Sequence, residues 1–190
     1  MPCLKTTIFF IRHAHSLYTP DELGRPLSKK GFSDAIKICQ TLKNEAIDIV
    51  ISSPYKRAVQ TVKGIAEMID QEVILEDGFM ERKLSERPIE DFGAAIKKVW
   101  EHPTFFWSGG ESNVTAQQRG VEATIKVLDL FEGQNIVVGT HGNIMVLIMN
   151  YFDEQYDLSF WNSLEMPDVY KLIFENKKLL EVTHLRSESR

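Results

Sequence analysis

Three short apolar runs constrain the fold of this chain more than any other feature: residues 7–11, 47–51 and 134–139. Each run has few polar side chains, is rich in β-branched residues and has the length of a buried strand. Apolar residues at helical spacing follow each of them along the chain. Strands that alternate with helices predict a largely parallel sheet with helices on both faces, which is a three-layer α/β/α fold.

The segments between and after these runs predict the remaining elements. Ser28 is placed to cap a helix whose apolar residues lie between positions 32 and 42. Ser53 is placed to cap the next helix, with Pro54 at its first helical position. The other expected elements, in chain order, are a strand at 72–75, a helix near 91–100, a helix at 112–131 with Gly133 beyond it, a helix from 144, and a closing pair of strands at 168–174 and 179–184.

The chain is expected to form a single domain, residues 1–190, which is long enough to bury a substantial core. Within it, residues 76–111 have the least regular pattern and combine several acids with the aromatic group Phe105-Phe106-Trp107. We interpret this segment as an insertion that forms a lid or a pocket wall.

Composition and charge argue against several classes of protein. The net charge is −5, so no overall basic surface is expected for nucleic acid or for an anionic membrane. The first residues lack the features of a signal peptide, and no apolar stretch approaches the roughly 20 residues of a membrane helix. Cys3 and Cys39 have no metal or redox spacing, which indicates a reducing cytoplasm. Neither begins a Cys-x5-Arg phosphate loop, so cysteine-dependent phosphatase chemistry is not expected.

Arginine and histidine side chains follow the predicted strands. Arg12 and His13 come directly after the first run, His141 comes after the third, and Arg57 lies near the start of the helix after the second. Because parallel strands end at one edge of a sheet, where α/β proteins bind ligands, we expect these residues to lie together. Arginine holds phosphoryl oxygens through charge-assisted bonds, and neutral histidine can attack phosphorus or transfer a proton. The sequence therefore predicts a phosphoryl-transfer site.

Such a site needs two further components. Backbone N–H groups at the N-termini of the helices after Ser53 and His141 are expected to add donors for the phosphoryl oxygens. A carboxylic acid must protonate the leaving oxygen and afterwards accept a proton from water.

Four segments resemble, in this order, the motifs of the histidine phosphatase superfamily, the phosphoglycerate mutase-like proteins. They are Arg12-His13, Ser52-Ser53-Pro54-Tyr55-Lys56-Arg57-Ala58-Val59-Gln60-Thr61, Gly110-Glu111-Ser112 and Val138-Gly139-Thr140-His141-Gly142. The resemblance extends from the first predicted strand to about residue 145.

The resemblance implies a role for each site residue. His13 would be the phosphorylated nucleophile, and Arg12, Arg57 and His141 would form the phosphate pocket. The family's proton donor is a carboxylate after the third strand, where Glu81 stands in this sequence. Three nearby acids are alternatives for that role: Glu76, Asp77 and Glu86. The resemblance further implies a phosphatase for a small phosphorylated substrate, with no metal and no cofactor.

The sequence departs from the family's commonest pattern at three places. Ala14 and His15 stand where glycine and then often glutamate are usual, Thr19 stands where asparagine is frequent, and residues 84–88 replace the usual Gly-x-aromatic-Glu-Gly pattern. Alanine is compatible with a backbone of negative φ, so we expect little distortion at Ala14. The change at 84–88 concerns the substrate more than the chemistry. The other histidines are interpreted as surface, loop and strand-exit residues: His15, His102 and His184.

Three alternative functions stay open at this point. A mutase would return the phosphoryl group to its substrate, although the cofactor-dependent mutases are generally longer, with extra segments that close over the site. A metal-dependent hydrolase would use His13 and His15 as a ligand pair, but among later strand ends only His141 is available to extend the set. A phosphoryl-binding module without turnover is suggested by Ala14 and by the altered segment at 84–88.

Overall fold

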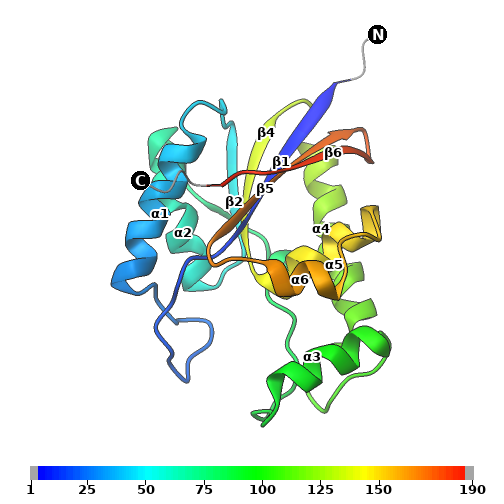
Figure 1. Ribbon diagram of the computed structural model, residues 1–190. Helices are drawn as coiled ribbons and strands as arrows, with labels where there is room; N and C mark the ends of the chain where they lie inside the picture. Colours follow the sequence, from blue (N-terminus) through cyan, green and yellow to red (C-terminus); the bar gives the residue numbers. More distant parts are fainter. Residues whose placement is uncertain (1–3, 187–190) are drawn as a thin grey trace.

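The computed structural model describes residues 4–186, and these form one six-stranded sheet in the order β3-β2-β4-β1-β5-β6 (Figure 1). Four neighbouring strands are parallel: β1 (Lys5–Arg12), β4 (Asn135–Thr140), β2 (Ile49–Ser52) and β3 (Ile74–Leu75). The hairpin of β5 (Asp168–Glu175) and β6 (Lys178–His184) pairs antiparallel with β1. The largely parallel α/β sheet expected from the sequence is confirmed, with an antiparallel pair at one edge.

Helices cover both faces of this sheet (Figure 1). On one face lie α1 (Lys29–Leu42) and α2 (Lys56–Met68), and on the other lie α4 (Asn113–Leu130) and α5 (Gly142–Phe152). Three shorter elements complete the described chain: the 3₁₀ turn η1 (Asp77–Phe79), α3 (Phe92–Glu101) and α6 (Leu158–Ser163).

The central strand β1 divides the core into two clusters. Phe9 and Ile11 pack with apolar residues of α1 and α2, whereas Ile8 and Phe10 pack with those of α4 and α5. All four side chains are fully buried. Side chains alternate between the faces of a strand, so a continuous apolar run is the pattern of a strand covered on both sides. This burial fixes the point at which β1 ends, and therefore the positions of the polar residues that follow it.

The capping residues predicted from the sequence are confirmed for α1 but not for α2. The Ser28 hydroxyl accepts a hydrogen bond from the Gly31 N–H at the start of α1, across 3.1 Å. Gly133, beyond the end of α4, has a φ of +79°, a conformation that glycine adopts without a steric penalty. The prediction for Ser53 and Pro54 is wrong, because α2 begins two residues later, with Tyr55 as its N-cap. The Ser53 hydroxyl is instead hydrogen-bonded to His141.

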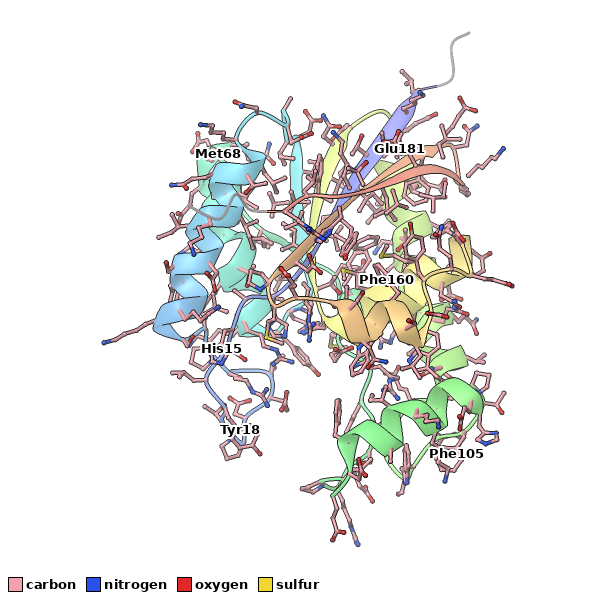
Figure 2. The ribbon with its side chains drawn as sticks, viewed as in Figure 1. His15, Tyr18, Met68, Phe105, Phe160 and Glu181 are labelled. Carbon is pink, nitrogen blue, oxygen red and sulfur yellow. The ribbon has the colours of Figure 1, made fainter. Side chains whose placement is uncertain are left out.

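Helix α6 has no counterpart among the elements expected from the sequence. It is six residues long, too short for a helical period to stand out. Asp157 caps it, and Phe160, labelled in Figure 2, packs edge-on against Tyr170 of β5 with ring centroids 5.2 Å apart. These contacts tie α6 to the antiparallel edge of the sheet.

The segment at 76–111 contains η1 and α3. In Figure 1, α3 lies away from the sheet, at the same end of the molecule as the loop that follows β1. Phe92 at the start of α3 contacts Trp161 of α6, with ring centroids 6.4 Å apart. Within residues 4–186, no helix is long and apolar enough to cross a membrane.

Candidate active site

His13 and His141 lie side by side at the carboxyl edge of the sheet. His13 follows β1 directly, and His141 follows β4, the parallel neighbour of β1. The backbone N–H of His13 donates to the Thr140 carbonyl across 3.0 Å, which keeps the two strand ends in register. The imidazole centroids are 5.1 Å apart, with planes at 65°. Two residues separated by 128 positions are thus brought together by strand pairing.

The surroundings of His13 assign its tautomer. Its Nδ1 lies 2.8 Å from the Ala14 carbonyl oxygen, which can only accept, so Nδ1 carries the proton. Its Nε2 accepts a hydrogen bond from Nε of Arg57 across 3.2 Å. Burial, followed by the charges of Arg57, Arg12 and Arg25, lowers the pKa of His13 to about 3, although the Ala14 carbonyl opposes this change. At neutral pH, His13 is therefore uncharged, with its lone pair on Nε2.

Arg57 lies in the first turn of α2 and is 4% exposed. Its Nη1 donates to the Glu22 carbonyl across 2.8 Å and lies 3.4 Å from the Glu22 carboxylate. The guanidinium also lies over the ring of Tyr55, 4.7 Å from the centroid. Burial, reinforced by the charge of Arg25, lowers the pKa of Arg57 to about 10, so the side chain is cationic at neutral pH. Its contacts direct Nε at His13.

Arg12, the last residue of β1, is held by the chain between α6 and β5. Its Nη1 donates to the carbonyl oxygens of Leu164 and Glu165, across 3.3 and 3.1 Å. Its Nε is buried and has no hydrogen-bond partner in the described part of the chain. A Cβ at position 142 would lie 3.1 Å from this Nε, so Gly142 allows the guanidinium to approach the start of α5. The partnerless Nε is the donor expected at an anion site.

His141 is fully buried between Ser53 and Tyr55. Its Nε2 lies 2.8 Å from the Ser53 hydroxyl, and its ring meets that of Tyr55 edge-on with centroids 4.8 Å apart. Burial, followed by the charges of His13 and Arg57, lowers the pKa of His141 well below its ordinary value. Among residues 4–186, no group is hydrogen-bonded to its Nδ1. That nitrogen is consequently available to a bound group.

Glu81 contacts the start of α5. Its carboxylate accepts hydrogen bonds from the backbone N–H groups of Asn143 and Ile144, across 3.2 and 3.0 Å, and from that of Arg82 across 2.8 Å. At the start of α5, where the sequence predicts donors for a phosphoryl group, the N–H groups of Asn143 and Ile144 therefore bind Glu81 instead. The charge of Glu81 also supports the cationic forms of Arg12 and Arg57. The carboxylate thus belongs to the same electrostatic site as both arginines.

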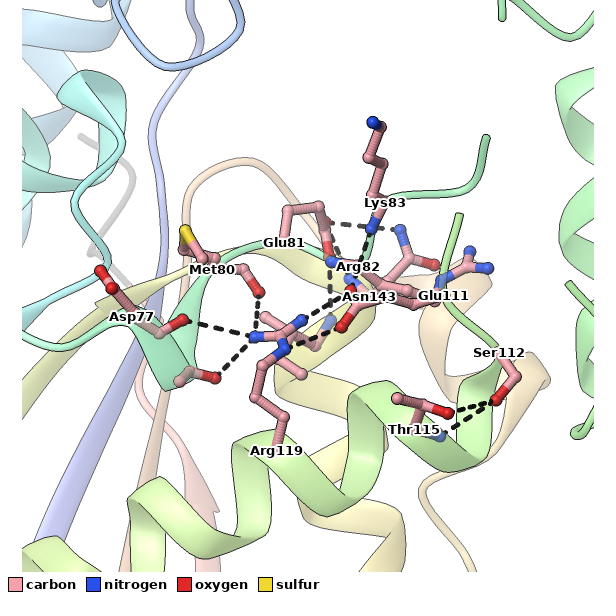
Figure 3. A network of polar contacts seen from close by, with 12 residues as sticks. Asp77, Met80, Glu81, Arg82, Lys83, Glu111, Ser112, Thr115, Arg119 and Asn143 are labelled. Carbon is pink, nitrogen blue, oxygen red and sulfur yellow. Dashed lines mark hydrogen bonds and ion pairs between the residues drawn. The ribbon is translucent and has the colours of Figure 1, made fainter. Parts of the chain in front are cut away.

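Arg119 of α4 fixes the chain that leads to Glu81 (Figure 3). Its Nη1 donates to the carbonyls of Gly78 and Met80 across 2.9 and 3.1 Å. Its Nε and Nη2 form a two-point contact with the Glu111 carboxylate, at 2.9 Å each. Glu111 belongs to one of the four motifs noted in the sequence, and the structure gives it this bracing contact.

The rival acids lie in other environments. Glu76 pairs with Lys126 of α4 across 2.6 Å, and Glu86 accepts a hydrogen bond from Ser108. Asp77 is exposed. Of the four candidate acids, Glu81 is the one whose carboxylate contacts the helix that begins beside His141.

The departures from the common motifs at Ala14, His15 and Thr19 can be followed in their local contacts. Ala14 is fully buried and donates its N–H to the Thr61 hydroxyl across 3.0 Å. Its φ is not positive, so the backbone there does not require glycine. The Thr19 hydroxyl donates to the Asp21 carbonyl and so is engaged within its own loop. His15 is exposed and bonded to the Ser28 hydroxyl, and residues 4–186 contain no cluster of three candidate metal ligands.

The structure adds three site residues that sequence reasoning missed. Arg25, in the loop after β1, is near enough for its charge to lower the pKa values of His13 and Arg57. Arg82 is 4% exposed, and its Nε and Nη1 have no partner within the described chain. Ser53, taken for a helix cap, contacts His141. The position of Ser53 after a strand end and that of Arg82 next to Glu81 are weak signals in the sequence that these residues lie near the site. Nothing in the sequence indicates the same for Arg25.

This arrangement agrees with comparisons to known proteins. The family model for the histidine phosphatase superfamily (branch 1) matches residues 8–182. The chain belongs to the histidine phosphatase superfamily. The chain is 30% identical over 149 residues to phosphoserine phosphatase 1 of Hydrogenobacter thermophilus, and the matched region covers 70% of each protein.

Solved structures share the fold of this chain. A phosphoserine phosphatase from Entamoeba histolytica, solved as a mutant in complex with phosphoserine, superposes with a TM-score of 0.78 and 18% identity. The alignment covers 96% of this chain and 98% of that one. A mycobacterial glucosyl-3-phosphoglycerate phosphatase gives a TM-score of 0.77 at 17% identity, over 97% and 100% of the two chains. The resemblance in the sequence motifs is thus confirmed at the level of family and fold.

Proposed function

We propose that the protein hydrolyses phosphomonoesters through a phosphohistidine intermediate on His13. The observation that carries the proposal is the contact between Nε of Arg57 and Nε2 of His13. It directs the lone pair of a buried, uncharged imidazole toward a cation that suits a phosphoryl group. Arg12 and His141 add, at the same edge of the sheet, the nitrogens Nε and Nδ1, which have no hydrogen-bond partner among residues 4–186.

The proposed reaction has two in-line displacements. In the first, Arg57 transfers its hydrogen bond from Nε2 of His13 to a phosphoryl oxygen, and the freed lone pair of Nε2 attacks phosphorus. The ester P–O bond breaks, and protonated Glu81 gives its proton to the leaving oxygen. In the second, the Glu81 carboxylate takes a proton from water, the oxygen of that water attacks phosphorus, and the P–N bond breaks to release phosphate. Arg12, Arg57 and His141 stabilise the charge on the phosphoryl oxygens in both steps.

The proposed substrate is a small phosphorylated molecule, and the reaction requires neither metal nor cofactor. Proteins of similar sequence or structure are named phosphoserine phosphatase and glucosyl-3-phosphoglycerate phosphatase, so phosphoserine and phosphoglycerate esters are the first compounds to assay. We further propose that the chain acts in the cytoplasm as one domain, with the segment at 76–111 as its pocket wall.

The test is phosphate release from p-nitrophenyl phosphate and a panel of phosphomonoesters, with and without a chelator. Quenching the reaction early should trap acid-labile phosphate on His13, and His13→Ala should abolish both trapping and turnover. His102→Ala, which changes an exposed loop histidine, is the matched control and should retain full activity. Full activity of His13→Ala would overturn the proposal, and loss of activity with chelator would overturn its metal independence. Interconversion of phosphoglycerates without phosphate release would favour a mutase.

A further inference from the structure

A carboxylate outside the four sequence motifs lies beside Arg12 on the neighbouring strand, β5. Asp168 is the first residue of β5 and is paired in register with Arg12, the last residue of β1. The segment before Asp168 supplies the two carbonyl groups, of Leu164 and Glu165, that accept hydrogen bonds from Nη1 of Arg12. The direction of the guanidinium therefore depends on how this segment is held.

Asp168 is 4% exposed and accepts four hydrogen bonds. Its Oδ2 accepts from the Glu165 N–H across 3.0 Å and from the Tyr170 hydroxyl across 3.2 Å. Its Oδ1 accepts from the Val169 N–H across 3.2 Å and lies 2.5 Å from Nε2 of His184. A buried carboxylate is costly unless its oxygens are paired, and here each oxygen has two donors.

We propose that Asp168 is a positioning residue for Arg12. Its Oδ2 accepts a hydrogen bond from the Glu165 N–H, and the Glu165 carbonyl accepts one from Arg12. The backbone of one residue, Glu165, thus links the Asp168 carboxylate to the Arg12 guanidinium. This role rests on the proposed function, because it acts through a phosphate-binding arginine. Burial lowers the pKa of Arg12, and the charges of Glu81 and Asp168 oppose that change. Asp168 thus favours both the orientation and the charge that binding of a phosphoryl group needs.

His184 completes the arrangement from the outer side of the sheet. Its ring stacks on Tyr170, with centroids 4.6 Å apart and planes at 10°, while its Nε2 contacts Asp168. His184 is about one quarter exposed as a side chain, whereas Asp168 is almost fully buried. The strand-exit histidine of the sequence therefore anchors the carboxylate that braces Arg12.

The test is a double-mutant cycle between Asp168→Asn and Arg12→Lys. The measured quantities are kcat/KM for p-nitrophenyl phosphate and the inhibition constants of inorganic phosphate and orthovanadate. With Arg12 intact, Asp168→Asn should weaken phosphate inhibition and lower kcat/KM by about tenfold, a typical coupling within one network. In the Arg12→Lys background the same change should cost less than about twofold. His184→Gln should give a smaller loss with the same dependence on Arg12.

Two controls separate positioning from folding. Glu45→Gln breaks another ion pair of β5, that of Glu45 with Lys171 at 2.6 Å, and should leave phosphate inhibition unchanged. Thermal unfolding of every variant measures stability separately. Equal losses from Asp168→Asn in both backgrounds would overturn the inference, as would unchanged phosphate inhibition in both Asp168→Asn and His184→Gln. Should Asp168→Asn fail to fold, the His184→Gln cycle with Arg12→Lys decides alone. The proposed function has a separate test, because full activity of His13→Ala would overturn it whatever the Asp168 variants show.

Discussion

Nε of Arg57 donates to Nε2 of His13 across 3.2 Å, and both side chains are buried. The same contact orients the nucleophilic nitrogen of the proposed reaction and keeps a positive charge beside it. A positive neighbour disfavours protonation of an imidazole, so Arg57 adds to the effect of burial on the pKa of His13. The arginine thus acts on the proposed nucleophile before any substrate is bound.

Arg57→Met is expected to raise the pKa of His13 from about 3 while leaving it below its ordinary value, because burial, the largest cause, remains. Titration of the imidazole by NMR measures this directly. Activity should fall by about 100-fold or more, since the proposed donor to the phosphoryl oxygens in the transition state is also lost. Arg87→Met, which changes an exposed arginine, is the control and should alter neither quantity. An unchanged His13 titration in Arg57→Met would contradict this account.

Acidification is expected to destabilise the protein through His13 and His141. Both have lowered pKa values in the folded chain, so below about pH 6.5 the unfolded chain binds protons that the folded chain does not. Stability should therefore fall as pH falls from about 6.5 toward 3, by up to about 1.4 kcal/mol per pH unit for each histidine.

Denaturant unfolding between pH 7 and pH 4.5 measures this dependence. His13→Asn should flatten it, while His102→Asn, at an exposed position, should not. An equally steep loss of stability in His13→Asn and in the native chain would show that other groups cause it.

Glu81→Gln is expected to discriminate between leaving groups. An alkyl phosphate needs its oxygen protonated as the bond breaks, so its hydrolysis should slow by about 100-fold or more. p-Nitrophenolate leaves readily without a proton, so p-nitrophenyl phosphate should be affected far less. Glutamine keeps an oxygen that can accept from the Asn143 or Ile144 N–H, which limits the structural change. The control variant is Glu76→Gln, which replaces an acid that pairs with Lys126. Equal slowing of both substrates by Glu81→Gln would indicate a different acid.

Gly142→Ala is expected to weaken phosphate binding by displacing Arg12. The added Cβ would lie 3.1 Å from Nε and 3.2 Å from Cζ of a guanidinium already held by two carbonyls. A misplaced binding group of this kind should raise the inhibition constant of phosphate by about tenfold.

Gly64→Ala supplies the matched control for that change. A Cβ at position 64, in the interior of α2, meets its nearest neighbour, the Cys39 sulfur, at 3.9 Å. This variant should keep native phosphate inhibition and gain about 0.5–1 kcal/mol of stability, because alanine favours the helix. Native phosphate inhibition in Gly142→Ala would show that Arg12 is free to shift.

The sequence by itself determined the layered fold and the meeting of Arg12, His13, Arg57 and His141. These follow from the period of apolar residues and from the rule that parallel strands end at one edge, and neither depends on the details of packing. Tertiary structure decided which acid contacts the site, where α2 begins, and what holds Arg12. Glu81 meets α5 across 62 positions, Ser53 meets His141 across 88, and Arg12 meets Leu164 across 152. Such contacts join groups that no local pattern in the sequence relates, so only the packed chain reveals them.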